Sequence, residues 1–243
     1  MRYAVISDVH SNEPALRAVL ADAERVGIDG ILCLGDVVGY GADPLPVIGL
    51  LTTAGARCVA GNHDRATVGL ADLQWFNPYA RRAAEWTAER LGDEETRYLT
   101  GLALVEEHQG AMLVHASPHR PERWTYLVSA GDGRAALAAT TAALCFVGHS
   151  HVPACWVLRP DGVVDFRRGV YRTRTEPGHR YLLNVGSVGQ PRDGDPDAAY
   201  AVWDLDAGEV AIRRVRYDVV EARRRIHAAG LPELLGDRLL RGR

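Results

Sequence analysis

Residues 2–36, RYAVISDVHSNEPALRAVLADAERVGIDGILCLGD, decide the fold of this chain. Residues 2–7 form an apolar run of strand length, residues 13–27 have the apolar spacing of a helix, and residues 30–34 return to a strand-like run. Asn12 stands directly before the helical pattern and is its predicted N-cap. A strand, a helix and a second strand in this order predict a parallel β-α-β unit with the helix packed on the sheet.

The alternation of strand and helix continues downstream and then gives way to short strands. Residues 44–55 predict a second helix and residues 57–61 a third strand of the parallel sheet. After residue 100 most apolar segments are strand-like, and Asp161-Gly162 marks a hairpin. The remaining predicted elements are two helices within 77–100, helices at about 131–142 and 218–230, and strands within 102–108, 111–117, 143–149, 154–168, 180–187 and 198–218.

A parallel part followed by an antiparallel part predicts two sheets stacked face to face. The predicted fold class is therefore α/β, a four-layer αββα sandwich of two mixed β-sheets flanked by helices. No linker, repeat or low-complexity segment interrupts the chain, so we expect a single domain over residues 1–243.

The composition is that of a globular protein and excludes several functional classes. The apolar fraction is 47% and the net charge is −3, which gives no general attraction to nucleic acid. No stretch approaches the ~18–20 uninterrupted apolar residues of a membrane span. The chain reaches Asp8 directly after its first strand, without room for a signal peptide, so we expect a cytoplasmic protein without a membrane partner.

Residues of the types that bind metal follow several of the predicted strands. Asp8 and His10 are two positions apart, as are His149 and His151, and in extended chain this spacing directs both side chains to one side. The carboxyl ends of strands are where α/β sheets collect their ligands. The full set of seven candidate metal ligands is Asp8, His10, Asp36, Asn62, His115, His149 and His151.

Glycines precede three of these positions. Gly35, Gly61 and Gly148 each stand directly before a candidate ligand or ligand pair. We expect them to supply the positive φ of a sharp exit from a strand and a close approach of the backbone to a bound ion.

The mixture of ligand types indicates which ions suit this site. Carboxylate, imidazole and carboxamide ligands together favour Mn²⁺, Fe²⁺, Zn²⁺, Co²⁺ or Ni²⁺, whereas an all-oxygen set would favour Mg²⁺ or Ca²⁺. Two cations at ~3.5–4 Å need a bridging anion, for which a carboxylate is suited. Only Asp8 and Asp36 are strongly placed carboxylates, so we expect one of them to bridge two divalent ions, with Mn²⁺ favoured.

Five ordered blocks of sequence resemble the calcineurin-like metallophosphoesterase superfamily, in particular its small bacterial members. They are D-x-H at residues 8–10, G-D at 35–36, G-N-H-D at 61–64, the histidine of VHASP at 115, and G-H-x-H at 148–151; residues 184–196 also look like a late segment of such members. The resemblance implies that Asp8, His10 and His151 hold one metal and that Asn62, His115 and His149 hold the second. It further implies that Asp36 bridges the two.

The resemblance also implies the reaction. A metal-bridging hydroxide would attack phosphorus in line, because paired metals lower the pKa of water and neutralise phosphoryl charge. His63 would face the phosphate and either protonate the leaving oxygen as general acid or stabilise its charge. The implied substrate is a small phosphorylated molecule, a phosphodiester or phosphomonoester, with nucleotides among the candidates.

One block departs from a branch of that superfamily. Protein serine/threonine phosphatases carry G-D-x-x-D-R-G, whose second aspartate orients the histidine and whose arginine grips phosphate. Residues 35–41 here read GDVVGYG, so both are missing. This disfavours a phosphoprotein phosphatase and leaves the partner of His63 open, since Asp64 on an extended segment would point away from it.

Several further residues have two interpretations each. Asn12 could donate to a substrate phosphate or cap the helix, and Arg192 could offer phosphate a planar fork or lie on the surface. Trp124 and Tyr126 could stack on a nucleobase or pack in a wall. Substrate selectivity is expected in residues 65–100 and 117–141.

Two other functions remain as alternatives. A catalytically silent scaffold of the same fold would bind a protein partner and would have lost metal ligands, and no ligand of the pattern is lost here. A metal-dependent nuclease would need a basic groove, against which the acidic net charge argues. The sequence makes no prediction of oligomeric state.

Overall fold

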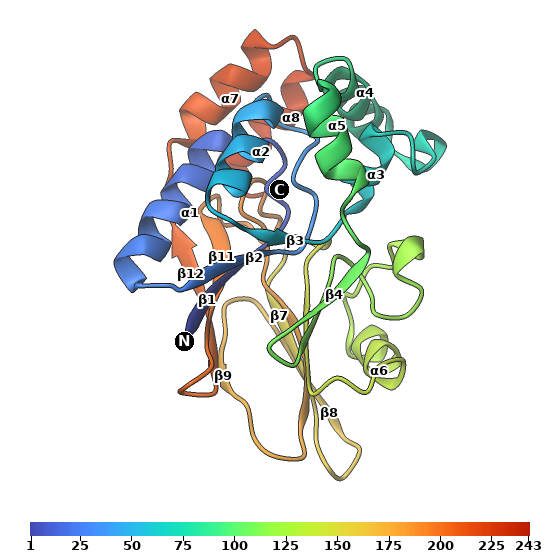
Figure 1. Ribbon diagram of the computed structural model, residues 1–243, viewed down its shortest axis with the longest axis vertical. Helices are drawn as coiled ribbons and strands as arrows, with labels where there is room; N and C mark the ends of the chain where they lie inside the picture. The colour runs from blue at the N-terminus through green and yellow to red at the C-terminus, as the bar shows by residue number, and fades with distance from the viewer.

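Two six-stranded β-sheets with helices outside them make up the protein (Figure 1). The computed structural model describes residues 1–243. One apolar cluster lies between the sheets and draws on both, with Val5 and Trp203 from the first and Phe146 and Leu183 from the second. The predicted α/β class and its four layers are confirmed.

The first sheet has the strand order β3-β2-β1-β11-β12-β9. Its parallel part is β1, β2 and β3, as predicted, and β11 then joins β1 in antiparallel orientation. The strands are β1 (Arg2–Ile6), β2 (Gly30–Cys33), β3 (Arg57–Cys58), β9 (Arg172–Arg174), β11 (Ala198–Asp204) and β12 (Glu209–Val215).

The second sheet has the order β4-β5-β6-β10-β7-β8. Its central strands β5, β6 and β10 are parallel, while β4, β7 and β8 pair antiparallel at the edges. The strands are β4 (Val105–His108), β5 (Ala111–Val114), β6 (Leu144–Val147), β7 (Ala154–Leu158), β8 (Val164–Arg168) and β10 (Arg180–Asn184).

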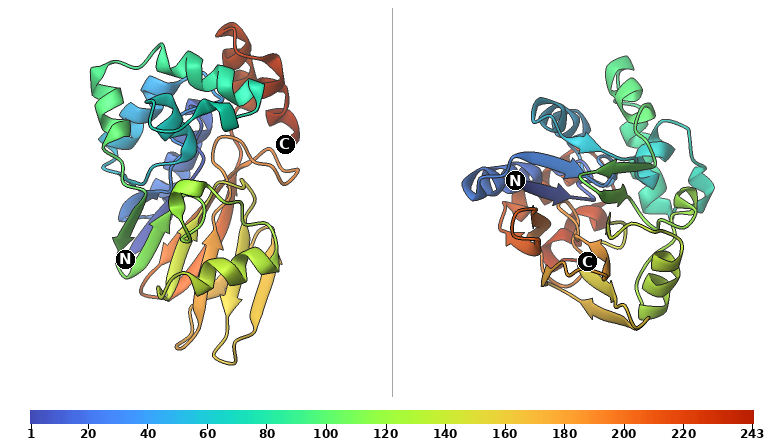
Figure 2. Two further views of the ribbon diagram at one scale, coloured as in Figure 1. Left: turned by 90° about the vertical axis from the view of Figure 1, so that its right-hand side faces the viewer. Right: turned by 60° about the horizontal axis from the view of Figure 1, so that its bottom comes forward.

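The helices cover the outer faces of both sheets. Helix α6 lies against the second sheet, and Figure 2 shows it across those strands, while α1 and α2 pack on the first sheet. No helix combines the length and apolar character needed to cross a membrane. The helices are α1 (Glu13–Val26), α2 (Pro44–Thr53), α3 (Asn62–Thr67), α4 (Pro78–Ala88), α5 (Asp93–Thr100), α6 (Ala130–Ala138), α7 (Val219–Ala228) and α8 (Glu233–Asp237), with 3₁₀ turns η1 (Leu73–Trp75), η2 (Pro121–Arg123) and η3 (Leu239–Arg241).

Both sheets are mixed, as predicted, and in the first sheet the mixture arises because β11 returns to β1 in antiparallel orientation. Two local expectations need correction. The third strand is only two residues long, at Arg57–Cys58. The segment after it is helical from Asn62 to Thr67 and is not extended, because the Asp64 carboxylate accepts from Gly61 N at 2.9 Å and caps the helix start.

Asn12 takes the predicted N-cap position of α1. Its Oδ1 accepts from Ala15 N at 3.2 Å, and its Nδ2 donates to Gly189 O at 2.9 Å and to Tyr217 Oη at 3.3 Å. The amide therefore ties the start of α1 to the loop after β10. A contact of Asn12 with substrate stays a prediction.

A buried carboxylate joins α1 to the first sheet and gives a stability prediction. Asp22, 7% exposed, accepts from Tyr200 Oη at 2.8 Å and from Arg213 Nε at 2.7 Å. The hydrogen bond from Arg213 holds the pKa of Asp22 below its usual value. We expect Asp22→Asn to lower the free energy of unfolding by about 1.5–3 kcal/mol at pH 7, the range for hydrogen bonds to a charged group.

Urea unfolding at several pH values checks this prediction. The lowered pKa means that the folded state stabilises the charged form, so the contribution is present above the unfolded pKa near 4 and is lost as pH falls below it. The difference between wild type and variant should therefore shrink in acid. A difference that is independent of pH would contradict the assignment.

Candidate metal centre

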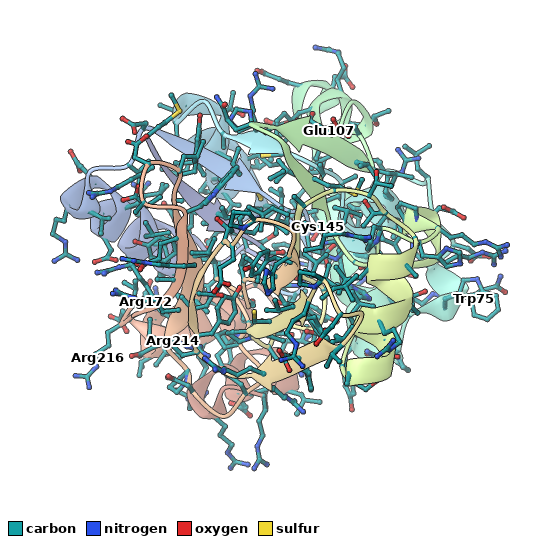
Figure 3. The ribbon with its side chains drawn as sticks, turned by 90° about the horizontal axis from the view of Figure 1, so that it is seen from below. Trp75, Glu107, Cys145, Arg172, Arg214 and Arg216 are labelled. Carbon is teal, nitrogen blue, oxygen red and sulfur yellow. The ribbon has the colours of Figure 1, made fainter.

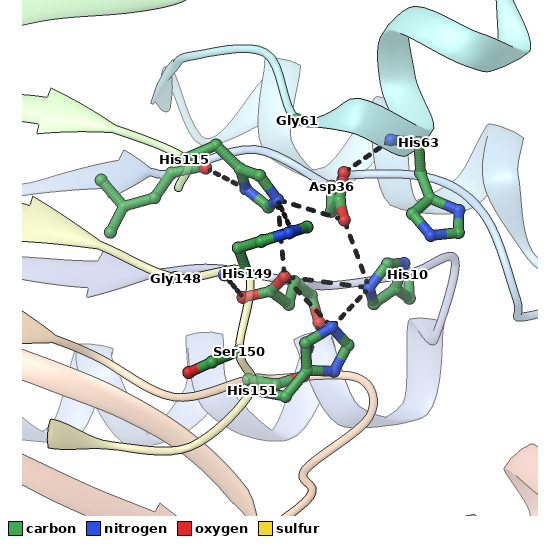
Figure 4. Close-up of polar contacts among 12 residues, drawn as sticks. His10, Asp36, Gly61, His63, His115, Gly148, His149, Ser150 and His151 are labelled. Carbon is green, nitrogen blue, oxygen red and sulfur yellow. Dashed lines mark hydrogen bonds and ion pairs between the residues drawn. The ribbon is translucent and has the colours of Figure 1, made fainter. Parts of the chain in front are cut away.

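The seven candidate ligands meet where both sheets present the ends of their parallel strands. Asp8 follows β1 and Asp36 follows β2 in the first sheet, while His115 follows β5 and His149 follows β6 in the second. Figure 4 shows Asp36, His115 and His149 converging, with His10 and His151 beside them. Six of the seven are buried, and Asn62, the first residue of α3, is half-buried.

The ligands are aimed by left-handed turns and not by extended strand ends. Asp8 has a φ of 52°, His10 of 49°, Asp36 of 50°, His149 of 64° and His151 of 60°. Both pairs, Asp8 with His10 and His149 with His151, do converge as predicted. The predicted cause, the alternation of side chains along an extended strand, is wrong, because these residues lie in left-handed turns. Each such residue costs about 1–3 kcal/mol, and strain of this kind persists where surrounding structure fixes it, typically at functional sites.

Of the three glycines predicted to have a positive φ, only Gly35 has one. Gly35 has a φ of +93°, as expected, but Gly61 has a φ of −96° and Gly148 is also outside the positive region. These two glycines serve close packing: a Cβ on Gly61 would lie 2.0 Å from Asp36 Oδ1, and one on Gly148 would lie 1.9 Å from Ser7 Oγ. The sharp turns at the site are therefore made mainly by the candidate ligand residues, which adopt positive φ themselves, and less by the glycines before them.

The first cluster of candidate ligands comprises Asp8, His10, Asp36 and His151, whose ligand atoms all lie within 4.8 Å of one another. His151 Nε2 lies 3.3 Å from Asp8 Oδ1, and His10 Nε2 lies 3.6 Å from Asp36 Oδ2. The second oxygen of Asp8 accepts from the backbone N of His149 at 3.0 Å, which fixes the carboxylate.

The second cluster comprises Asp36, His115 and His149. His115 Nε2 lies 3.3 Å from Asp36 Oδ2 and 3.1 Å from His149 Nδ1. Asp36 is common to both clusters, so the pair of clusters is consistent with a binuclear metal site joined by one carboxylate.

The tautomers of the histidines test whether cations fit these clusters. Nδ1 of His10 lies 3.1 Å from Val38 O, and Nδ1 of His151 lies 2.6 Å from Gln190 O. A carbonyl only accepts, so both Nδ1 atoms carry hydrogen and both Nε2 atoms of the neutral rings carry lone pairs. These Nε2 atoms face each other at 3.2 Å. A cation bound by both removes the repulsion, so the residues fit a metal ion.

Buried polar atoms without partners give the same indication. Asp8 Oδ1, Asn62 Oδ1 and His149 Nε2 are buried and have no hydrogen-bond partner. Leaving such groups unpaired costs about 1–3 kcal/mol each. Metal coordination would satisfy oxygen and nitrogen lone pairs of this kind.

Burial sets the protonation of the cluster. It lowers the pKa of His10 and His151 well below the usual value and that of His149 to about 3, so these rings are neutral. Burial opposes charge on His115 as well, but the Asp36 carboxylate outweighs it and raises the His115 pKa to about 9. His115 and Asp36 thus form an ion pair that a cation would replace, since metal binding releases ligand protons.

His63 lies beside the clusters without joining either. Its backbone N donates to Asp36 Oδ1 at 2.9 Å, and its ring lies between Tyr40 at 4.4 Å and Phe76 at 4.8 Å between centroids. Burial lowers the pKa of His63 to about 4. Asp64 turns away to cap α3, so it does not orient this ring.

Glycine stands where the serine/threonine phosphatase motif has its second aspartate. A Cβ on Gly39 would lie 2.5 Å from His63 Nδ1, so a side chain there would act directly on this ring. His63 Nδ1 is buried and has no hydrogen-bond partner. The aromatic ring of Tyr40, in place of the motif's arginine, covers His63 instead.

Arg192 lies close to the centre without an acidic partner. Its Nη2 donates to Gln190 Oε1 at 2.9 Å and to Tyr40 Oη at 3.4 Å, and its buried Nε has no hydrogen-bond partner. Its charge opposes protonation of His151. A guanidinium with a free donor at this place suits an anionic group, the role predicted for Arg192.

The chain belongs to the calcineurin-like phosphoesterase superfamily, because residues 1–208 match the model of the calcineurin-like phosphoesterase superfamily domain. With this match, the buried aspartate and histidine clusters define a metallophosphoesterase. An uncharacterised protein of Methanocaldococcus jannaschii is 39% identical over 252 residues, covering 99% of this chain and 98% of that protein.

Solved structures agree with this assignment. A metallophosphoesterase from Sphaerobacter thermophilus is 40% identical, has a TM-score of 0.87 and is matched over 100% of both chains. A hypothetical protein from Pyrococcus horikoshii has the same fold at 21% identity, with a TM-score of 0.78 over 100% of this chain and 98% of that one.

A single methyl group at Gly61 should disturb the centre. We expect Gly61→Ala to push the Asp36 carboxylate aside and weaken metal binding roughly 10- to 100-fold, the usual effect of disturbing the support of a ligand. Gly49→Ala is the matched control: Gly49 is exposed in α2 with open space around its Cβ, and alanine there should stabilise the helix by about 0.5–1 kcal/mol. Calorimetric titration with Mn²⁺ measures both variants, and equal affinities would contradict the packing argument.

Proposed function

We propose that this protein is a two-metal-dependent phosphoesterase that hydrolyses a small phosphodiester or phosphomonoester, with nucleotides among the candidate substrates. The observation that carries the proposal is the position of Asp36, which belongs to both ligand clusters. A carboxylate shared by two imidazole-rich clusters suits a pair of divalent ions close together.

The residues divide between the two ions in the following way. Asp8, His10 and His151 would hold one, His115, His149 and Asn62 would hold the other, and Asp36 would contribute to both. The two clusters support this division for the aspartates and histidines, and the unpartnered buried Oδ1 supports it for Asn62. Mn²⁺ is the favoured ion within the group Mn²⁺, Fe²⁺, Zn²⁺, Co²⁺ and Ni²⁺ that such ligands accept.

The residues around the clusters act on the phosphate. Two bound ions would neutralise phosphoryl charge and lower the pKa of water. His63, whose backbone N donates to Asp36, would act as general acid toward the leaving oxygen. Burial alone keeps the ring neutral at pH 7, so the negative charge of a bound phosphate would have to favour its protonated form. Arg192 and Asn12 are the proposed substrate contacts. The free donor of Arg192 supports its part, whereas Asn12 would have to give up a hydrogen bond to Gly189 O or Tyr217 Oη to contact phosphate.

We propose that residues 1–243 form one domain. The residues beyond 208 pack on the preceding helices: Ile226 of α7 and Leu235 of α8 share an apolar cluster with Tyr40 and Trp86, and Trp86 Nε1 donates to Ala229 O at 3.1 Å. This packing ties the C-terminal helices to the body that carries the centre.

The alternatives receive less support. A silent scaffold has no need of two complete ligand clusters with positive φ at their ligands. A nuclease would need a basic track, against which the net charge of −3 argues.

Metal analysis and hydrolysis assays test the proposal. Protein reconstituted with Mn²⁺ should contain two ions per chain and hydrolyse bis-p-nitrophenyl phosphate or p-nitrophenyl phosphate. Folded protein that hydrolyses neither ester with any of the five ions would refute it, and one bound ion per chain would refute the binuclear form.

A further inference from the structure

We propose that the leaving group of the substrate carries a planar aromatic base, as a nucleotide does, and that this base stacks in an aromatic cleft beside the metal centre. The inference rests on the proposed phosphoesterase function and names the class of substrate for the same site. It assigns binding roles to Trp75, Phe76, Trp124 and Tyr126.

The cleft begins at the metal centre and has the size of a small-molecule site. Its cavity has a volume of about 590 Å³, within the range of about 300–1,000 Å³ for ligand pockets. Asn62, His63 and His149 line its inner end. An ester whose phosphate lies at the metal ligands would therefore place its leaving group in this cavity, past His63.

Aromatic side chains line the cleft and touch the histidines of the centre. The Tyr126 ring stacks on His149, with centroids 4.1 Å apart and planes at 28°. Phe76 meets the ring of His63 edge to face at 4.8 Å. The aromatic lining thus contacts both the proposed general acid His63 and the candidate ligand His149.

The outer part of the cleft exposes aromatic surface that nothing in the chain covers. Trp75 is 83% exposed, Tyr126 is 51% exposed, and Leu70 beside them is 47% exposed. Figure 3 shows Trp75 at the margin of the molecule. Aromatic faces of this kind bind bases by stacking, which accepts every base because each has a π face.

The charged residues that line the cleft balance one another, which favours a neutral base over a polyphosphate as the occupant. Arg65 and Arg123 are balanced by Asp72 and Glu122 among the lining residues. A polyphosphate or nucleic-acid backbone needs an excess of basic residues, which this lining does not provide. Balanced donors and acceptors suit the polar edge of a base and the hydroxyls of a sugar.

Both walls come from segments between the ligand blocks. Trp75 and Phe76 lie at the turn η1 after α3, and Trp124 and Tyr126 follow the turn η2 after β5. These segments fall within the stretches 65–100 and 117–141 in which substrate selectivity is expected. The metal-binding scaffold and the cleft are therefore separate in sequence while adjacent in space.

Two ligands that differ only in the base test this inference. Calorimetric titration of the Mn²⁺-loaded protein should give adenosine 5′-monophosphate an affinity roughly 5- to 150-fold higher than ribose 5-phosphate, the factor that base stacking supplies. Trp75→Ala should reduce that ratio several-fold. Trp75 is so exposed that its removal should leave folding intact. Tyr79→Ala is the matched control, because Tyr79 is 48% exposed on the neighbouring α4 but does not line the cleft, and its ratio should equal that of wild type.

The outcomes separate this inference from the proposed function. Equal affinities for the two ligands would overturn the base site, as would a Trp75→Ala variant that weakens both ligands equally or changes only the oligomeric state. If bis-p-nitrophenyl phosphate is hydrolysed without a preference for the base, the inference alone fails. If the preference is found but no ester is hydrolysed with any ion, the base site stands and the phosphoesterase proposal fails.

Discussion

Asp36→Asn is expected to abolish binuclear metal binding and to lower turnover by on the order of 10²–10³-fold or more, the effect of removing a charge-stabilising group from a preorganised site. Asp36 Oδ2 faces His10 Nε2 at 3.6 Å and His115 Nε2 at 3.3 Å. An amide has no negative charge to hold two cations together. Metal content per folded chain and the rate of p-nitrophenyl ester hydrolysis are the measurements.

A second buried aspartate provides the control for this variant. Asp22→Asn also removes a buried carboxylate but lies on α1 outside both clusters, so it should lose stability and keep two ions and full turnover. If Asp36→Asn retained two ions per chain, Asp36 would not be the bridge. Loss of metal by both variants would point to a general effect on folding.

His63→Ala is expected to keep both ions and lose about 10²–10⁴-fold in kcat, the range for general acid catalysis. The prediction rests on geometry: His63 lies beside the clusters, in contact with Phe76, and is a ligand in neither cluster. Removal of the ring should therefore leave metal binding intact. The leaving group would then have to depart without a proton from His63.

The choice of leaving group distinguishes the two roles of His63. If the ring protonates the leaving oxygen, the loss in His63→Ala should be large for a phenyl ester and small for a p-nitrophenyl ester, whose anion departs without a proton. If the ring only stabilises charge, both esters should lose similar factors. An unchanged rate with both esters would remove His63 from the mechanism. Metal analysis of the variant provides the necessary control.

The fold was predictable where it depends on local pattern. The β1, α1 and β2 elements follow from apolar periodicity, and Asn12 caps α1 as its position indicates. The pairing of β11 with β1, which places Ala201 opposite Val5, was not predictable. Strands so far apart in the sequence pair according to which sheet edges the rest of the fold leaves free, and the local sequence does not show this. Helix α3 was missed because it has only one or two turns and its start depends on the contact of Asp64 with Gly61.

The convergence of the candidate ligands was predictable, but their geometry was not. Residue types and their places after strands identified the candidates that the structure brings together, yet the positive φ of Asp8 and Asp36 has only a weak sequence signal, the general enrichment of Asp and His in that region. Tyr40 and Phe76 were missed as neighbours of His63, because their packing depends on loops whose shape comes from tertiary contacts. The exposure of Trp75 has no signal in the sequence, because it depends on how its loop packs in the folded chain.

The supply of ligands by both sheets links metal loading to the stability of the whole fold. Asp8 and Asp36 extend from the first sheet, and His115 and His149 from the second, so each ion would act as a cross-link across the sandwich. A ligand that binds only the folded state stabilises it by about 2.7 kcal/mol at a free concentration 100 times its dissociation constant. The abundance of the ion would thereby set the fraction of chains that is folded as well as the rate of turnover.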